Sequence, residues 1–187
     1  MTRRILLALT LFSSLGIAQT LSGDALVKAL QQGGYVIVLR HASSPGAIPA
    51  GASERQLDEA GRASATAMGK ALRDLKIPIG EVLSSPTYRA LETVKYGQFG
   101  KAVETVELGD NAQSMAGGTP AQAAWLQKRV TQVPKGTNTI LITHEPNLRD
   151  AFPAVGTAFA QGEALIFGPG SSLVARVKIE QWPSLLK

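Results

Sequence analysis

Short apolar runs and longer amphipathic stretches alternate along most of the chain. The run "YVIVL" at 35–39 is apolar throughout, which is typical of a strand that helices cover on both faces of a parallel sheet. Similar runs predict three more strands, at 81–85, 101–108 and 138–143. The segment 163–180 predicts a hairpin, because its two apolar runs are joined by a Gly-Pro-Gly-Ser turn.

Apolar positions three or four residues apart predict helices between these strands. The longest helix is expected at roughly 58–75, where one apolar stripe is formed by Leu57, Gly61, Ala65, Met68, Leu72 and Leu75. Two more helix starts are predicted at Ser85–Pro86 and Thr119–Pro120, because each pair places a capping side chain before a proline. These helices should continue to about Tyr96 and about Gln132.

The predicted elements follow one another in the order of an α/β protein. A further helix ends at Gly33 before the first strand, and a short one begins at Glu145 after the fourth. Strands and helices in alternation, closed by a hairpin, predict a three-layer α/β/α sandwich with a mostly parallel central sheet. The length of 187 residues suits a single domain. Its irregular loops at 42–56 and 108–119 are as long as loops that usually carry function.

The first 18 residues differ in composition from the rest of the chain. Arg3 and Arg4 precede the apolar run "ILLALTLF", and the small residues Gly16 and Ala18 follow, as in a cleaved secretory signal peptide. The apolar run is too short to span a bilayer comfortably, which disfavours a membrane anchor. We therefore predict a signal peptide at 1–18 and a mature domain at 19–187. The domain should be periplasmic or secreted, with no membrane association after cleavage.

Composition and charge narrow the range of functions. A hydrophobic content of 44% with 18% charged residues is that of a folded protein. The formal net charge is +5, but no run of basic residues is interleaved with aromatic ones, so no nucleic-acid partner is expected. A modest positive charge suits an anionic small substrate. The chain has no cysteine, which excludes disulfides, thiolate metal sites and a cysteine nucleophile.

Polar residues follow three of the predicted strands directly. Arg40 and His41 come after the first strand, the segment 84–89 after the second, and His144 with Glu145 after the fourth. Ligands of open α/β sheets bind at the carboxyl ends of the strands, so these residues can converge on one pocket. Arg89 falls in the first turn of its predicted helix, where the helix dipole favours an anion.

Two histidines and two arginines around a helix start suit a phosphoryl group. Guanidinium groups clamp its oxygens, one imidazole can attack phosphorus, and the other can stabilise the charge of the transition state. Other interpretations stay open for each residue. A single histidine after a strand is more often structural, two histidines with a carboxylate can bind a metal ion, and Arg89 alone can be a surface residue.

Four blocks of the chain carry a resemblance to a known family. They are "VIVLRHA", "RQLDEAGRASATAMGKAL", "VLSSPTYRALETV" and "ILITHEPNLRD". In order and spacing they resemble the histidine phosphatase superfamily, the phosphoglycerate mutase-like proteins, over most of residues 33–170. The resemblance implies the phosphoglycerate mutase-like form of the α/β sandwich.

The resemblance also implies roles for the matching residues. His41 would be the nucleophile that becomes a phosphohistidine, while Arg40, Arg89 and His144 would bind the phosphoryl group. Water would then hydrolyse the phosphoenzyme, with no metal ion or other cofactor. The chain departs from the common Arg-His-Gly motif of the family, because Ala42 follows His41. Alanine is small and occurs in branches of the family, so this departure does not indicate an inactive protein.

The general acid that protonates the leaving group has two candidates. Relatives with a carboxylate after the third strand favour Asp110, whereas relatives with one after the second histidine favour Glu145. Glu107 is more simply a charge on the surface at the end of a strand. Arg55 is either an additional phosphate clamp or one partner of a salt bridge that holds its loop.

The sequence thus predicts an exported phosphatase that hydrolyses phosphomonoesters through a phosphohistidine on His41. Its substrate would be a small phosphomonoester or a phosphoprotein, and phosphohistidine in proteins stays open as a choice. A phosphoglycerate mutase is disfavoured by the short chain and the predicted signal peptide. The alternative from another class is a non-catalytic module that binds a phosphate-containing ligand on the same fold.

Overall fold

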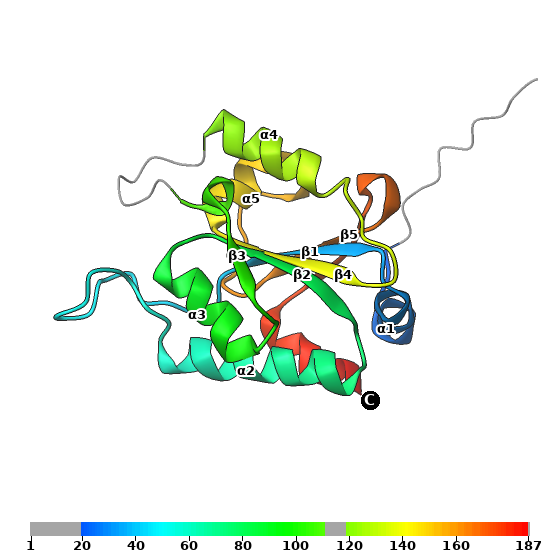
Figure 1. Cartoon of the computed structure of the whole chain (residues 1–187), viewed down its shortest axis with the longest axis horizontal. Helices are drawn as coiled ribbons and strands as arrows, with labels where there is room; N and C mark the ends of the chain where they lie inside the picture. The colour runs from blue at the N-terminus through cyan, green and yellow to red at the C-terminus, as the bar shows by residue number, and fades with distance from the viewer. Residues whose placement is uncertain (1–19, 111–118, 187) are drawn as a thin grey trace, which may run out of the picture.

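A six-stranded sheet lies between two layers of helices in the computed structural model of the protein (Figure 1). The structure describes residues 20–110 and 119–186, so the predicted signal peptide and most of the loop 108–119 lie outside the described residues. The strands are β1 Tyr35–Arg40, β2 Ile79–Ser84, β3 Ala102–Glu104, β4 Asn138–Thr143, β5 Ala164–Phe167 and β6 Leu173–Val177. Their order across the sheet is β3-β2-β4-β1-β5-β6.

The sheet is mixed, and this corrects the expectation of a mostly parallel one. Neighbouring strands are parallel from β3 through β2 and β4 to β1. The hairpin then adds β5 antiparallel to β1, and β6 antiparallel to β5. The prediction of an α/β/α sandwich is confirmed.

Helices cover both faces of this sheet. They are α1 Gly23–Gln32, α2 Glu59–Asp74, α3 Tyr88–Gly97, α4 Pro120–Arg129 and α5 Glu145–Ala151. Figure 1 shows α4 and α5 over one face and α2 and α3 over the other, where the C-terminal 3₁₀ segment η4 (Ile179–Leu186) lies beside α2. No helix among residues 20–110 and 119–186 has the length and apolar character needed to cross a bilayer.

Alternating side chains of β1 build the two halves of the core. Val36 and Val38 belong to the cluster that packs under α4 and α5, whereas Ile37 and Leu39 belong to the cluster on the side of α2 and α3. All four are fully buried. A strand with apolar residues on both faces must be covered twice, because successive side chains point to opposite sides.

Two of the predicted element boundaries are wrong for identifiable reasons. The helix expected from Ser85–Pro86 begins only at Tyr88, because the Ser85 hydroxyl accepts the N–H of Thr87 within a turn and does not cap α3. The strand expected over 101–108 ends at Glu104, and a 3₁₀ turn, η1 (Val106–Leu108), follows it. At Thr119 the predicted cap is confirmed as a full capping box with Gln122, although α4 ends at Arg129, short of Gln132.

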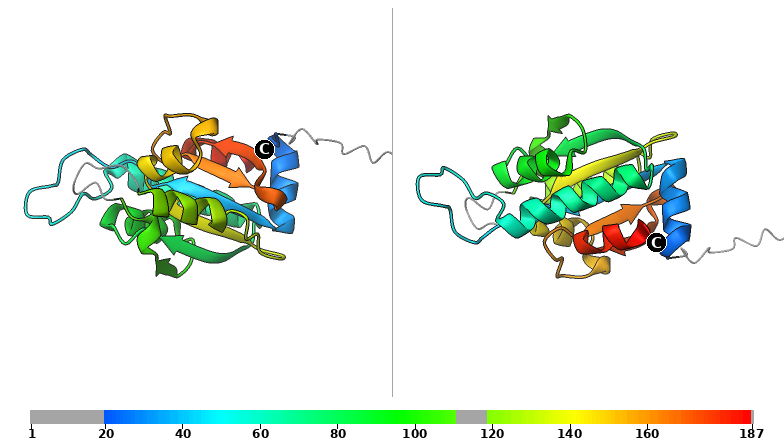
Figure 2. Two further views of the ribbon diagram at one scale, coloured as in Figure 1. Left: turned by 90° about the horizontal axis from the view of Figure 1, so that it is seen from above. Right: turned by 90° about the horizontal axis from the view of Figure 1, so that it is seen from below.

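The register of the parallel strands places the candidate residues side by side. Arg40 pairs with Thr143 at the carboxyl ends of β1 and β4, and the next residue, His41, donates its N–H to the Thr143 carbonyl at 3.0 Å. The N–H of Ser85 extends the β2–β4 ladder to the Ile142 carbonyl at 2.9 Å. This end of the sheet, with the loop 42–58, lies opposite α1 (Figure 2).

Candidate active site

The two histidines of the chain meet at the carboxyl ends of β1 and β4. The ring centroids of His41 and His144 are 5.2 Å apart, with their planes tilted by 60°. Both side chains are buried, with 4% and 1% of the residue surface exposed. The structure therefore brings together two residues that lie 103 positions apart in the sequence.

The guanidinium group of Arg89 bridges the two rings. Its Nε donates to Nε2 of His41 at 3.2 Å, and its Nη2 lies 3.1 Å from Nδ1 of His144. The opposite nitrogen of His41, Nδ1, lies 2.8 Å from the Ala42 carbonyl. Because a carbonyl only accepts, Nδ1 carries the proton and Nε2 presents its lone pair to Arg89.

Burial and neighbouring positive charge keep both imidazoles neutral. Desolvation lowers the pKa of His41 well below its usual value, and His144, Arg89 and Arg40 add to the shift, while the bond to Ala42 opposes it. Desolvation likewise lowers the pKa of His144 well below its usual value, with Arg89, Arg55 and Arg40 adding to the shift. A neutral imidazole has the lone pair that a nucleophile needs.

Acid should destabilise the protein through these two rings. The folded-state pKa of each lies below its unfolded value, so the unfolded chain binds more protons as the pH falls. The contribution of the two rings to the free energy of unfolding should be full above about pH 6.5. Below that pH, the free energy of unfolding should fall by up to about 1.4 kcal/mol per pH unit for each ring. We expect urea unfolding at pH 7.5 and 5.5 to show a larger loss for the wild type than for a His41→Asn/His144→Asn variant. Equal losses would contradict this assignment.

Two more arginines approach the histidines. Nη1 of Arg40 donates to the Phe159 carbonyl, whereas its Nε is buried with no hydrogen-bond partner in the described part of the chain. Desolvation lowers the pKa of Arg40 and of Arg89 from the usual value. Arg55 is about one-third exposed and lies with Nη2 3.8 Å from Oδ2 of Asp110. Arg55 therefore forms an ion pair and also lines the pocket, while its role as a phosphate clamp stays a prediction.

Both candidate acids lie at the site, in different surroundings. Oδ2 of Asp110 contacts Nη2 of Arg89 and lies 3.3 Å from Nδ1 of His144. Its side chain is almost fully buried. Glu145 begins α5 directly after His144, is about one-third exposed, and lies 3.5 Å from Arg149. Asp110 thus belongs to the guanidinium cluster, and Glu145 to the edge of the pocket.

A small cavity of about 160 Å³ opens over these groups. It is lined by Arg40, His41, Arg55, Asp110, His144, Glu145, Pro146 and Gln161. Two arginines and two imidazoles converge here, with the guanidinium of Arg89 in contact with both rings, which suits a compact anion rather than a large apolar ligand. A metal cation between the rings would be repelled by the guanidinium of Arg89.

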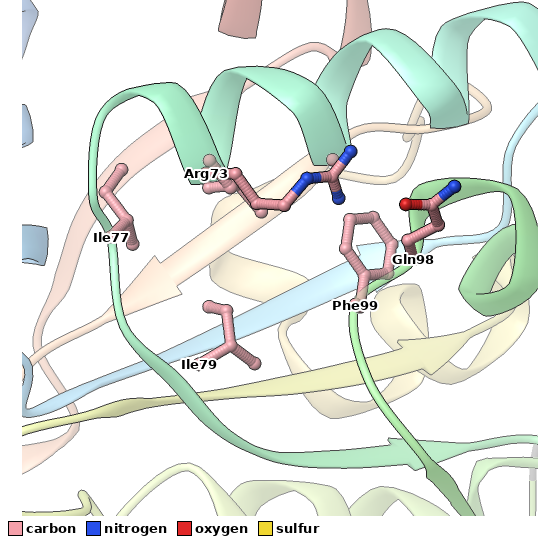
Figure 3. Close-up of a pocket in the computed structure, with 7 residues that line it drawn as sticks. Arg73, Ile77, Ile79, Gln98 and Phe99 are labelled. Atoms are coloured by element: carbon pink, nitrogen blue, oxygen red, sulfur yellow. The ribbon is translucent and has the colours of Figure 1, made fainter.

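A second pocket, of about 200 Å³, lies at the C-terminal end of α2 (Figure 3). It is lined by Gly69, Leu72, Arg73, Ile77, Ile79, Gln98 and Phe99. Arg73, which is charged, donates to the Gly97 carbonyl at 3.0 Å. None of the described residues that line this pocket is a histidine or a carboxylate, so they do not supply the groups that catalyse proton or phosphoryl transfer.

The contacts or the burial of three polar or small residues near the site could not be predicted from their local sequence. Helical spacing predicts that Glu92 pairs along its own helix, but its carboxylate accepts the N–H of Leu57 at 2.7 Å and so ties the loop 42–58 to α3. A loop position predicts that Ser44 faces solvent, but it is buried and donates to the Gln56 carbonyl. Ala42 is fully buried, and its backbone is not among the described left-handed residues, so a glycine is not required there.

Sequence reasoning missed the partners of His144. Nε2 of this ring lies 2.8 Å from the Ser85 hydroxyl and 3.4 Å from that of Thr87. Ser85 lies in the segment 84–89 that is expected at the pocket, but the role that its local sequence predicts is that of a helix cap, not of a partner of His144. Its position directly after a strand, beside two other strand ends that carry histidines, is the signal that would have found it.

Comparisons with known proteins give a family match over part of the chain and a shared fold. Residues 36–112 match the profile of the histidine phosphatase superfamily (branch 1). The protein histidine phosphatase SixA complexed with tungstate is similar with a TM-score of 0.58 and 20% identity, over 79% of this chain and 98% of that one. The SixA protein of Agrobacterium tumefaciens has a TM-score of 0.55 and 20% identity, over 78% and 97%.

A third solved structure, TTHB049 from Thermus thermophilus, has a TM-score of 0.55 and 16% identity, over 77% of this chain and 99% of that one. No curated protein matches the chain by sequence. At these identities the similarity to solved structures establishes a shared fold.

Proposed function

Because residues 36–112 match the histidine phosphatase superfamily, we propose that the protein hydrolyses phosphomonoesters through a phosphohistidine on His41. The observation that carries the proposal is the contact of one guanidinium, Arg89, with both His41 and His144 in a buried pocket. Such a centre presents a lone pair and positive charge to the same small anion.

Binding of the phosphoryl group would replace contacts within the protein. The anion would enter between the rings, take the Nη and Nε donors of Arg89, and meet the guanidinium groups of Arg40 and Arg55 at the pocket wall. In the similar SixA structure the bound oxyanion is tungstate, a tetrahedral anion like phosphate.

The reaction would proceed in two displacements. Nε2 of His41 forms a bond to phosphorus while the bond from phosphorus to the leaving oxygen breaks, and that oxygen takes a proton from a carboxyl group, which we assign to Asp110. Water then attacks the phosphohistidine, the P–N bond breaks, and the water proton passes to the carboxylate. His144 and the arginines stabilise the negative charge on the phosphoryl oxygens in both steps.

The proposed cellular location rests on the sequence alone. The pattern of residues 1–18 supports export, and the protein would then act on phosphomonoesters or phosphoproteins in the periplasm or outside the cell. Fractionation of cells that express the full chain would test this, with N-terminal sequencing of the mature protein as the readout.

Turnover with chelator present is the direct test of the reaction. We expect the purified protein to hydrolyse an aryl phosphate at an undiminished rate in excess EDTA. Acid-labile, base-stable phosphate should be trapped on the protein by rapid denaturation in alkali. A panel that includes small phosphomonoesters and a phosphohistidine-containing protein would separate the substrate classes. Phosphate binding without turnover of any substrate would favour the non-catalytic alternative.

A further inference from the structure

The ring of His144 is held on the side that faces away from Arg89. Its Nε2 lies 2.8 Å from the hydroxyl of Ser85, while Nδ1 faces Nη2 of Arg89 at 3.1 Å. The hydroxyl of Thr87 is also near Nε2, but at 3.4 Å it makes at most a weak hydrogen bond. Ser85 is therefore the main partner of this nitrogen.

The backbone fixes the Ser85 hydroxyl in place. The residue follows β2 directly, is fully buried, and donates its N–H to the Ile142 carbonyl, two residues before His144. Its Oγ also accepts the N–H of Thr87 at 3.3 Å and lies 3.1 Å from the Thr87 hydroxyl. Because the β2–β4 ladder sets both backbones, the hydroxyl and the imidazole have a defined separation.

The two histidines share one arrangement with different partners. In each ring one nitrogen is anchored and the other faces Arg89: Nδ1 of His41 is anchored by a backbone carbonyl, and Nε2 of His144 by a side-chain hydroxyl. Anchoring matters because an imidazole that rotates by half a turn exchanges a nitrogen for a carbon at the site. Only the anchor of His144 can be removed by a side-chain substitution.

We propose that Ser85 is a positioning residue for phosphoryl transfer: its hydroxyl donates to Nε2 of His144, so that Nδ1 of the neutral ring carries the proton, which faces Oδ2 of Asp110 in the free site and is donated to a phosphoryl oxygen in the complex. This inference rests on the proposed function, since it assigns the orientation of a group that stabilises the transition state. Ser85 does not touch the phosphoryl group and acts through His144.

The test compares two neighbouring serines. Ser84 is also fully buried, but its hydroxyl donates only to the Ser85 carbonyl among the described contacts. We expect Ser85→Ala to lower kcat for an aryl phosphate by about 5- to 100-fold with a smaller change in KM, because an oriented donor is lost mainly in the transition state. Ser84→Ala should stay within about twofold of the wild type, and Ser85→Thr should recover part of the loss.

A spectroscopic readout distinguishes positioning from a general structural effect. The chain has two histidines, so ¹⁵N-histidine labelling of untagged protein gives one set of ring signals for each. Ser85→Ala should change the ring nitrogen shifts of His144 and its response to inorganic phosphate, while the ring signals of His41 stay as in the wild type. Ser84→Ala should change neither ring.

Two results would overturn the proposal. One is a Ser85→Ala variant with wild-type kcat, and the other is one with unchanged His144 ring signals. Either result leaves the proposed function standing as long as the wild type turns over phosphate esters. An inactive wild type would instead defeat the proposed function, and the His144 signals with and without phosphate would still decide the role of Ser85.

Discussion

Replacing His41 with alanine is expected to lower kcat on the order of 10⁴-fold or more, because alanine has no atom that can form the covalent intermediate. The residue is buried with Nε2 directed at Arg89, and no second imidazole lies in an equivalent orientation, since Nδ1 rather than Nε2 of His144 faces the site. Steady-state kinetics with an aryl phosphate, together with trapping of the phosphoenzyme, measure both consequences. His41→Ala should yield no trapped phosphate.

The matched control is His144→Ala, which removes the other ring. This variant keeps the nucleophile, so a phosphoenzyme should still form, with kcat lowered by about 10²- to 10³-fold through the lost stabilisation of charge. Both variants should retain binding of inorganic phosphate, since Arg89, Arg40 and Arg55 are intact. Substantial activity of His41→Ala, or trapped phosphate on it, would show that another residue is the nucleophile.

The convergence of these histidines could be predicted from the sequence because it follows from topology. Parallel strands have their carboxyl ends at one edge of the sheet, so a histidine after β1 and another after β4 must both lie there. Their adjacency depends on the strand order, which places β1 beside β4. Nothing in the apolar pattern specifies that order.

Side-chain roles that depend on contacts between distant segments could not be predicted. Ser85 has the sequence signature of a helix cap, but its hydroxyl is engaged by a turn and by His144, and α3 starts at Tyr88. Glu92 has the spacing of a helix ion pair, but the loop 42–58 supplies a closer partner, the Leu57 N–H. In both cases the competing group comes from a different part of the chain, and local propensity carries no information about it.

The mixed sheet shows the same limit for whole elements. The hairpin was visible from two apolar runs around a Gly-Pro turn, and it forms as β5 and β6. The hairpin pairs with β1 in the antiparallel sense, and this pairing provides hydrogen-bond partners for the backbone groups at the edge of β1. Local sequence does not specify that pairing, because it depends on tertiary contacts. Predictions for residues 1–18 concern a part of the chain that the structure does not describe, and they stay predictions.

The second large effect is expected from the general acid. Asp110→Asn should lower kcat by about 10²- to 10⁴-fold for an alkyl phosphate, whose leaving oxygen needs a proton, and far less for a nitrophenyl phosphate, whose leaving group departs as an anion. The carboxyl group lies within the guanidinium cluster beside His144 Nδ1, where the phosphoryl group is proposed to bind.

Glu145→Gln is the matched control, because it makes the same change of carboxylate to amide at the edge of the pocket. We expect it to change kcat by less than about tenfold, with no dependence on the leaving group. Asp110→Asn should also bind inorganic phosphate at least as tightly as the wild type, because the carboxylate no longer competes for Arg89 and Arg55.

A leaving-group dependence confined to Glu145→Gln would instead assign the role of general acid to Glu145. If neither variant shows one, no carboxylate of this site protonates the leaving group. The proton donor would then be solvent. Hydrolysis would be slow, as expected if the protein binds phosphate-containing ligands without catalysing their hydrolysis.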